Sequence, residues 1–115
     1  MGACDYENVV IGKYKDASEA FRYVVNEARY YHGHGGYSGT IAEKSDFRMI
    51  TLPPRKDPYK YADELMDSDN SVNDKWGPAN CIEIKGKRLK ELRERNNLKG
   101  KRGVKAFLFF GWASS

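Results

Sequence analysis

The sequence predicts an α+β fold: a single domain, residues 1–115, with an antiparallel sheet of about four strands, one long amphipathic helix packed on one face and a shorter second helix. Three observations predict this fold. The chain has 115 residues, close to the commonest size of one domain. Apolar residues recur with helical spacing in one long segment, and several short apolar runs elsewhere are typical of strands.

The long helix is the clearest element. Asp16 and Glu19 resemble a capping box at its start, and Gly33 ends it. Its apolar face follows the i, i+3, i+4 pattern at Ala17, Ala20, Phe21, Val24, Val25, Ala28 and Tyr31. Asp57 followed by Pro58 is typical of a helix start, and it predicts the shorter helix over "PYKYADELMDSD".

Five segments have the composition of strands. "NVVIG" (8–12) is a short apolar run near the start of the chain. "YSGTIA" (37–42) and "FRMITL" (47–52) predict a hairpin around a polar turn at 43–46. "CIEIK" (81–85) alternates in polarity, and "VKAFLFFGWA" (104–113) predicts a buried central strand.

Positive charge is concentrated in one segment. The net charge of the chain is +4, but residues 85–105 carry ten Lys/Arg against two Glu. The remainder is therefore mildly acidic, which is the pattern of a local surface for an anionic partner, although a solvated charged helix gives the same composition. We treat this segment as a basic insert between the last two strands. Its basic patch is Lys85, Lys87, Arg88, Lys90, Arg93, Arg95, Lys99, Lys101 and Arg102.

A glycine-rich loop, "HGHGGYSGT" (32–40), follows the long helix and contains both histidines. Its spacing superficially resembles a dinucleotide-binding fingerprint, but that motif lies between a strand and the N-terminus of a helix. Here the loop follows the C-terminus of a helix, the negative end of the dipole. The order of elements therefore argues against a Rossmann or P-loop site.

Three interpretations of this loop remain open. In the first, backbone N–H groups bind an anion, with side-chain donors close by; the ligand-binding residues are then His32, Gly33, His34, Gly35, Gly36, Tyr37, Ser38, Gly39, Thr40 and Lys44. In the second, His32 and His34 act as acid and base in a metal-independent cleavage of a phosphodiester. In the third, the loop is only a turn.

Metal binding is less well supported. His32 and His34 supply two ligands, and a third would have to come from Asp5, Cys4 or Cys81, which qualify by residue type alone. We therefore predict no metal site and no cofactor. Trp76 stands in a polar loop, where an indole ring either stacks on a base or covers the end of the core. We include Trp76, with Tyr37, among the candidate stacking residues.

Three strings, "HGHGGYSGTIAEK", "DKWGPANCIEI" and "FLFFGWAS", taken together resemble a family of small bacteriophage- and prophage-encoded proteins. The resemblance extends over roughly residues 16–113, with the basic insert as its variable part. It implies a viral origin, and small phage accessory proteins are commonly anti-defence factors. No activity is carried over to individual residues.

The resulting hypothesis is a phage-encoded anti-defence protein that binds and sequesters an anionic, nucleotide-like immune signal. Binding without turnover is favoured over catalysis. We expect the protein to act in the host cell cytoplasm, without a membrane partner, and its assembly into a homo-oligomer is possible. One alternative is an inhibitor that binds a host defence nuclease, an RNA or a ribonucleoprotein through the basic segment. The other is the phosphodiesterase that uses His32 and His34.

Overall fold

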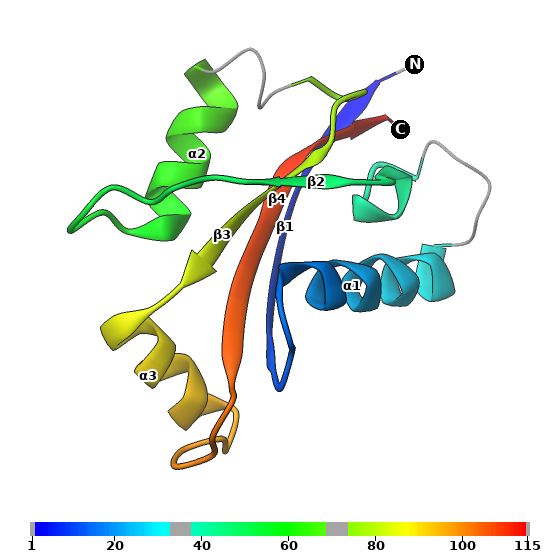
Figure 1. The fold of residues 1–115 in the computed structure, drawn as a ribbon. Coiled ribbons are helices and arrows are strands. Elements are labelled where there is room, and N and C mark those ends of the chain that lie inside the picture. Colours follow the sequence, from blue (N-terminus) through cyan, green and yellow to red (C-terminus); the bar gives the residue numbers. More distant parts are fainter. Residues whose placement is uncertain (1, 33–37, 69–73, 115) are drawn as a thin grey trace.

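A computed structural model describes residues 2–32, 38–68 and 74–114 of the chain. They form one compact α+β domain whose elements are, in chain order, β1 (Ala3–Gly12), α1 (Ala17–His32), η1 (Ile41–Glu43), β2 (Phe47–Met49), α2 (Pro58–Ser68), β3 (Ala79–Ile84), α3 (Gly86–Arg95) and β4 (Lys105–Ser114). Figure 1 shows a central sheet with α1 on one side and with α2 and α3 on the other.

The sheet has the strand order β1-β4-β3-β2 and is mixed. β4 is central and pairs antiparallel with β1 from Ala3↔Ser114 to Gly12↔Lys105, and antiparallel with β3 from Asn80↔Phe110 to Ile84↔Ala106. β2 pairs parallel with β3, with Phe47 opposite Ala79. The first and last segments of the chain are therefore neighbours, and β1 and β2 form the two edges.

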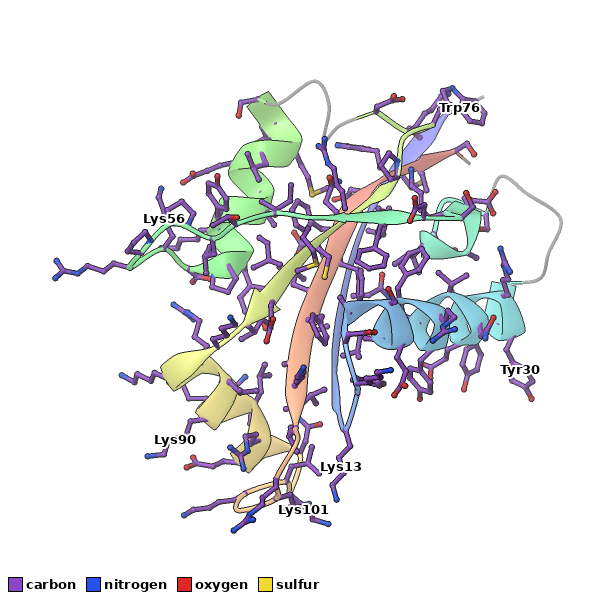
Figure 2. The ribbon with its side chains drawn as sticks, in the orientation of Figure 1. Lys13, Tyr30, Lys56, Trp76, Lys90 and Lys101 are labelled. Atoms are coloured by element: carbon purple, nitrogen blue, oxygen red, sulfur yellow. The ribbon has the colours of Figure 1, made fainter. Side chains whose placement is uncertain are left out.

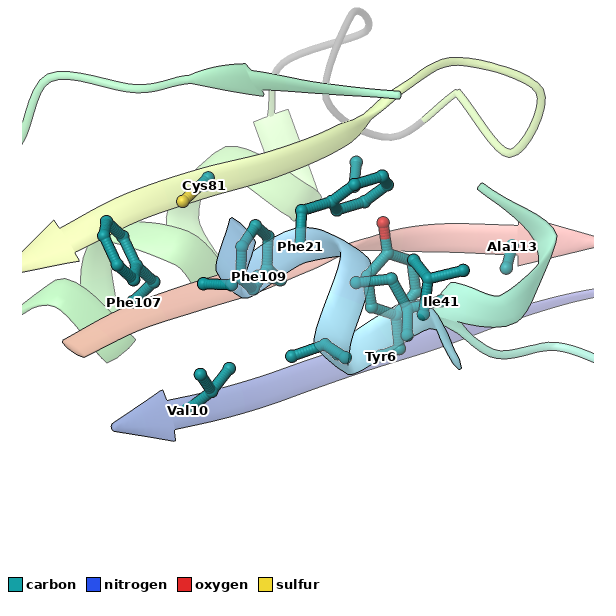
Figure 3. Close-up of a cluster of buried hydrophobic side chains, with 12 residues drawn as sticks. Tyr6, Val10, Phe21, Ile41, Cys81, Phe107, Phe109 and Ala113 are labelled. Carbon is teal, nitrogen blue, oxygen red and sulfur yellow. The ribbon is translucent and has the colours of Figure 1, made fainter. Parts of the chain in front are cut away.

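Alternation along β4 divides the core into two layers. Phe107 and Phe109 face α1, where they pack with Phe21, Ile41 and other buried side chains (Figure 3). Leu108 and Phe110 face the opposite side, against α2 and α3. Because both faces of the sheet are covered at β4, the sequence of this strand is almost continuously apolar. The prediction of a buried central strand is confirmed.

The predicted N-terminal cap of α1 is present. The Asp16 side chain accepts a hydrogen bond from the Glu19 amide at 3.0 Å, and Glu19 accepts one from the Lys15 amide at 3.4 Å. The apolar face of α1 then buries Ala20, Phe21 and the two valines that follow against the sheet. The predicted helix is therefore confirmed, but Tyr31, which the sequence pattern placed on its apolar face, is 73% exposed.

Two parts of the fold prediction are wrong. The sheet is not wholly antiparallel, because β2 and β3 run parallel with α2 as the crossover between them. In the described part of the predicted hairpin, residues 41–43 form the 3₁₀ helix η1 instead of a strand. Local side-chain hydrogen bonds explain the turn: Thr40 accepts from the Ala42 amide at 3.2 Å, and the Ser38 hydroxyl donates to Glu43 at 2.6 Å.

The described residues contain three α-helices, where one long helix and one shorter helix were predicted. The third, α3, lies in the basic segment and runs from Gly86 to Arg95. Its leucines, Leu89 and Leu92, pack on the core layer beneath α2 and α3. Across the described residues, no helix combines the length and apolar character needed to cross a membrane.

Candidate anion-binding groove

A groove of about 610 Å³ lies where β2 diverges from β3. The last hydrogen bond from the chain after β2 to β3 joins the Ile50 amide to the Cys81 carbonyl at 2.8 Å. Beyond it, Pro53 and Pro54 carry the chain away from the sheet toward α2, while β3 continues to Ile84 and turns into α3. The groove is the space between these two diverging segments.

The groove has an apolar floor and a cationic rim. Met49, Ile50, Leu52, Pro53 and Ile84 supply apolar surface, and Glu83 is the single acidic residue of the lining. The rim is supplied by two separate segments, the turn before α2 and the junction of β3 with α3. Its cationic side chains are Arg55, Lys56, Lys85, Lys87 and Arg88.

Ion pairs neutralise only part of this rim. Lys56 lies 3.3 Å from Glu64, Arg88 lies 3.2 Å from Asp57, and Lys85 lies 4.0 Å from Glu83. Within the described residues, Arg55 and Lys87 have no carboxylate at ion-pair distance. The rim therefore keeps a positive excess that favours an anion.

The start of α3 adds to this positive field. The residue before it, Lys85, makes no side-chain capping hydrogen bond, and its first turn contains no acidic residue. The first amides of the helix therefore have no side-chain cap from Lys85, and the positive end of the helix dipole adds to the charges of Lys87 and Arg88. Lys87 and Arg88, in this same first turn, line the groove.

The predicted glycine-loop site is described only at its two ends. His32 is the last residue of α1, whereas Gly33, His34, Gly35, Gly36 and Tyr37 lie outside the described residues. Gly39 has a φ of 72°, and its amide donates to the Ser114 carbonyl at 2.8 Å, which joins this segment to the end of β4.

The side-chain donors predicted beside the loop already have partners. Ser38 and Thr40 are hydrogen-bonded to each other at 2.8 Å, and both take part in the turn that forms η1. Lys44 is buried, and its ammonium donates to the carbonyls of Lys75 and Gly77 at 3.0 and 2.7 Å. Burial lowers the pKa of Lys44, and reaching a ligand would require it to leave both carbonyls.

Trp76 and Lys44 line a second hollow of about 350 Å³, next to the start of β3. The Trp76 side chain is 64% exposed, and the Lys75 ammonium lies 5.2 Å from the centre of its ring. The interpretation of Trp76 as a cover for the core is therefore wrong, because the ring lies mostly in solvent. Its role in stacking stays a prediction.

The basic patch is divided among three places. Lys85, Lys87 and Arg88 line the groove, and Lys90, Arg93 and Lys99 line a separate hollow of about 380 Å³ beside α3. Arg95, at the end of α3, is exposed, as are Lys101 and Arg102 in the loop that follows. Figure 2 shows Lys90 and Lys101 at the opposite end of the molecule from Trp76, so this part of the basic patch does not meet the candidate stacking residue Trp76 within one chain.

Few of the described side chains have the chemistry of a catalyst. Burial raises the pKa of the Cys81 thiol to about 12, which disfavours a reactive thiolate. A hydrogen bond with Asp63, followed by burial and the negative charges of Asp63 and Asp5, raises the pKa of Glu7 to about 7. No cluster of three or more metal-ligating side chains occurs in the described part of the chain.

Sequence reasoning missed the half of the groove that precedes α2. Arg55 and Lys56 follow two prolines and precede a helix cap in "PPRKDP", and Arg55 has a positive φ of 64°. Cationic side chains in such a tight turn point toward solvent. This was the feature of the sequence that could have indicated a cationic surface before α2. Their approach to residues 85–88 depends on the parallel pairing of β2 with β3, which the predicted antiparallel sheet did not include.

Comparison with family models, curated proteins and solved structures found no match to this chain.

Proposed function

We propose that this protein binds an anionic, nucleotide-like ligand, without turnover, in the groove between the turn before α2 and the start of α3. One observation supports the proposal above all others: five cationic side chains from two segments far apart in the sequence surround an apolar floor in a groove of about 610 Å³. Ligand pockets for small molecules typically measure about 300–1,000 Å³ and combine apolar walls with a few polar groups.

The two parts of the groove suit the two parts of a nucleotide. Arg55 and Lys87, which have no ion-pair partner among the described residues, provide cations for a phosphate, and the amides at the start of α3 are close to Lys87. Leu52, Pro53 and Met49, the last of them 50% exposed, offer apolar surface to a ring. The part of the lining that the structure describes contains no histidine or cysteine, which favours binding over cleavage.

The biological role we propose is sequestration of a nucleotide immune signal by a phage-encoded anti-defence protein in the host cell cytoplasm. The support for this role is the resemblance of three sequence strings to small phage proteins, together with the ligand chemistry of the groove. A protein that only sequesters must return its ligand unchanged. That requirement separates it from an enzyme acting on the same signal.

Calorimetry with a panel of mono-, di- and cyclic nucleotides tests the proposed function, followed by mass spectrometry of the small molecules released on heat denaturation. The expected result is saturable binding of at least one nucleotide and its recovery intact in near-stoichiometric yield. Absence of binding across the panel at tens of micromolar would reject the ligand class. A converted product would instead support the phosphodiesterase, with His32 and His34 as its candidate residues.

A second candidate function is inhibition of a host defence nuclease or ribonucleoprotein through the basic segment. The observation that favours it is the exposure of cationic side chains along α3 and the following loop, among them Lys87, Lys90 and Lys101. Binding to RNA through such a surface would weaken steeply with salt, with a log–log slope of nearly one for each phosphate neutralised. A flat salt response would reject an RNA-binding surface.

A further inference from the structure

The outer edge of β1 is long and exposed. β1 has ten residues, and among the strands of the described residues it pairs only with β4, so its other side presents free backbone N–H and C=O groups. Native proteins commonly shorten or interrupt such edges, for example with proline. The opposite edge is of that kind, because β2 has three residues and is soon followed by Pro53 and Pro54.

Apolar and aromatic side chains accompany the β1 edge. Val9, near the middle of the strand, is 42% exposed. On the other face of the sheet, Tyr23, Glu27 and Tyr31 follow one another at i, i+4 spacing on α1, and together with β1 they line a trough of about 580 Å³. Tyr23 and Tyr31 are 52% and 73% exposed. Exposed tyrosines beside an unpaired edge are typical of a protein interface.

The charges along this edge are negative toward the start of β1 and positive just after its end. Asp5 and Glu7 lie in the first half of β1, and Lys13 and Lys15 follow its last residue. Antiparallel pairing of two copies sets the acidic half of each strand beside the lysines of the other, whereas parallel pairing sets like charges side by side. The edge is therefore complementary to itself under a two-fold axis, as an isologous interface requires.

We propose that two copies of this chain associate through their β1 edges, antiparallel, into one continuous sheet with a two-fold axis near Val9. When Val9 lies opposite Val9 of the second copy, Asp5 lies opposite Lys13 and Glu7 lies opposite Ile11. This pairing contains no like-charge contact along β1. The two α1 helices then lie on the same side of the joined sheet, and their tyrosine rows flank the joint.

The dimer goes beyond the proposed ligand binding and does not depend on it. The groove lies next to β2, at the edge opposite β1, so dimerisation leaves both grooves accessible. Either proposal can therefore fail while the other holds.

Sedimentation velocity of the full chain, from low to high micromolar concentration, tests the interface. The wild type should shift from monomer to dimer as concentration rises. Because each charged pair occurs twice in the dimer, Asp5→Lys or Lys13→Asp should raise the dimer dissociation constant about tenfold or more. The double variant Asp5→Lys/Lys13→Asp restores opposite charges and should return the constant to within about threefold of the wild type.

A matched control and a second variant complete the test. Lys60→Asp makes the same charge reversal as Lys13→Asp at an exposed position of α2, and it should leave the dissociation constant unchanged. Val9→Lys places two lysines together at the axis and should abolish the dimer, with unchanged circular dichroism. A wild type that stays monomeric, a double variant as weak as the single ones, or a dimer that survives Val9→Lys would overturn the proposal.

Discussion

The Arg88 guanidinium and the Asp57 carboxylate form a 3.2 Å ion pair that joins the first turn of α3 to the residue preceding α2. Asp57 also accepts a hydrogen bond from the Tyr59 amide at 2.9 Å and so caps α2. One carboxylate therefore caps a helix and connects the two segments that supply the cationic rim of the groove. The site and the stability of the fold are linked at this pair.

The two partners should contribute unequally to stability. Asp57→Ala removes the cap and the ion pair, and it should lower the free energy of unfolding by about 1–2 kcal/mol. Arg88→Ala removes only an ion pair whose arginine side chain is 44% exposed, and it should cost less than about 1 kcal/mol. Urea unfolding monitored by circular dichroism measures both values. Equal losses in the two variants would contradict the dual role of Asp57.

The Glu7–Asp63 pair should make stability depend on pH. Their hydrogen bond, the largest cause, raises the pKa of Glu7 from 4.5 to about 7 in the folded protein. A group whose pKa is higher when folded stabilises the fold most fully below its unfolded pKa, and this contribution is lost as pH rises through the folded pKa. The contribution of Glu7 should therefore decline between pH 4.5 and about 7.

Glu7→Gln tests this dependence, because the amide still donates to Asp63 but does not titrate. Urea unfolding of wild type and variant is compared at about pH 5 and about pH 8, at low protein concentration. The wild type should lose more stability than the variant between these two values. An identical change in both proteins would show that Glu7 does not titrate in this range.

Gly111 allows Tyr6 to pack against β4. Its φ is 152°, and an added Cβ would lie 3.0 Å from the Tyr6 hydroxyl and 3.2 Å from the Asn80 amide nitrogen. Gly111→Ala should cost about 1–3 kcal/mol of stability. Gly103→Ala is the control, because Gly103 also has a positive φ, 74°, but open space around it; its cost should be clearly smaller.

Removing the Tyr6 hydroxyl provides a second test of the contact between Tyr6 and Gly111. It is buried and has no hydrogen-bond partner within the described residues. Tyr6→Phe should therefore leave stability unchanged or raise it, and in the Gly111→Ala background it should recover part of the loss. If Tyr6→Phe destabilises the protein by as much as Gly111→Ala, the contact is not the reason for the glycine.

A ligand site in the groove and a ligand site in the glycine loop predict different effects of substitutions at His34 and Trp76. If the ligand binds in the groove, His34→Ala and Trp76→Ala should change its dissociation constant less than about twofold, because neither residue belongs to the described lining of the groove. Titration calorimetry with the nucleotide that binds best gives the comparison. A large loss in either variant would return the site to the glycine loop, and lost turnover in His34→Ala would support the enzyme hypothesis.

The elements that the sequence predicted well are those fixed by local pattern. α1 has an apolar stripe and a cap at Asp16, and β4 has an apolar run long enough to be covered on both faces. The pairing of β2 was missed because Ser38, Thr40 and Glu43 form side-chain bonds that favour a turn over a strand. A strand–helix–strand order in the chain was the signal for parallel pairing.

The candidate site was predictable only in part. The charge excess of residues 85–105 indicated an anionic partner and correctly included Lys85, Lys87 and Arg88 of the groove. Arg55 and Lys56 lie about thirty residues earlier, and only the tertiary arrangement brings them to the same rim. Lys44 shows the opposite case, because its charge suggested a ligand donor while burial commits it to two backbone carbonyls.

The most direct test of the groove is calorimetric titration of two charge-matched double variants. Arg55→Ala/Lys87→Ala removes the two groove cations that have no ion-pair partner among the described residues. Lys99→Ala/Lys101→Ala removes two cations of the basic segment outside the groove. Both proteins lose the same net charge. The groove variant should bind the nucleotide at least about tenfold more weakly, and the control should stay within about twofold of the wild type. Equal losses in the two variants would mean that the ligand responds to overall charge, and the groove would not be its site.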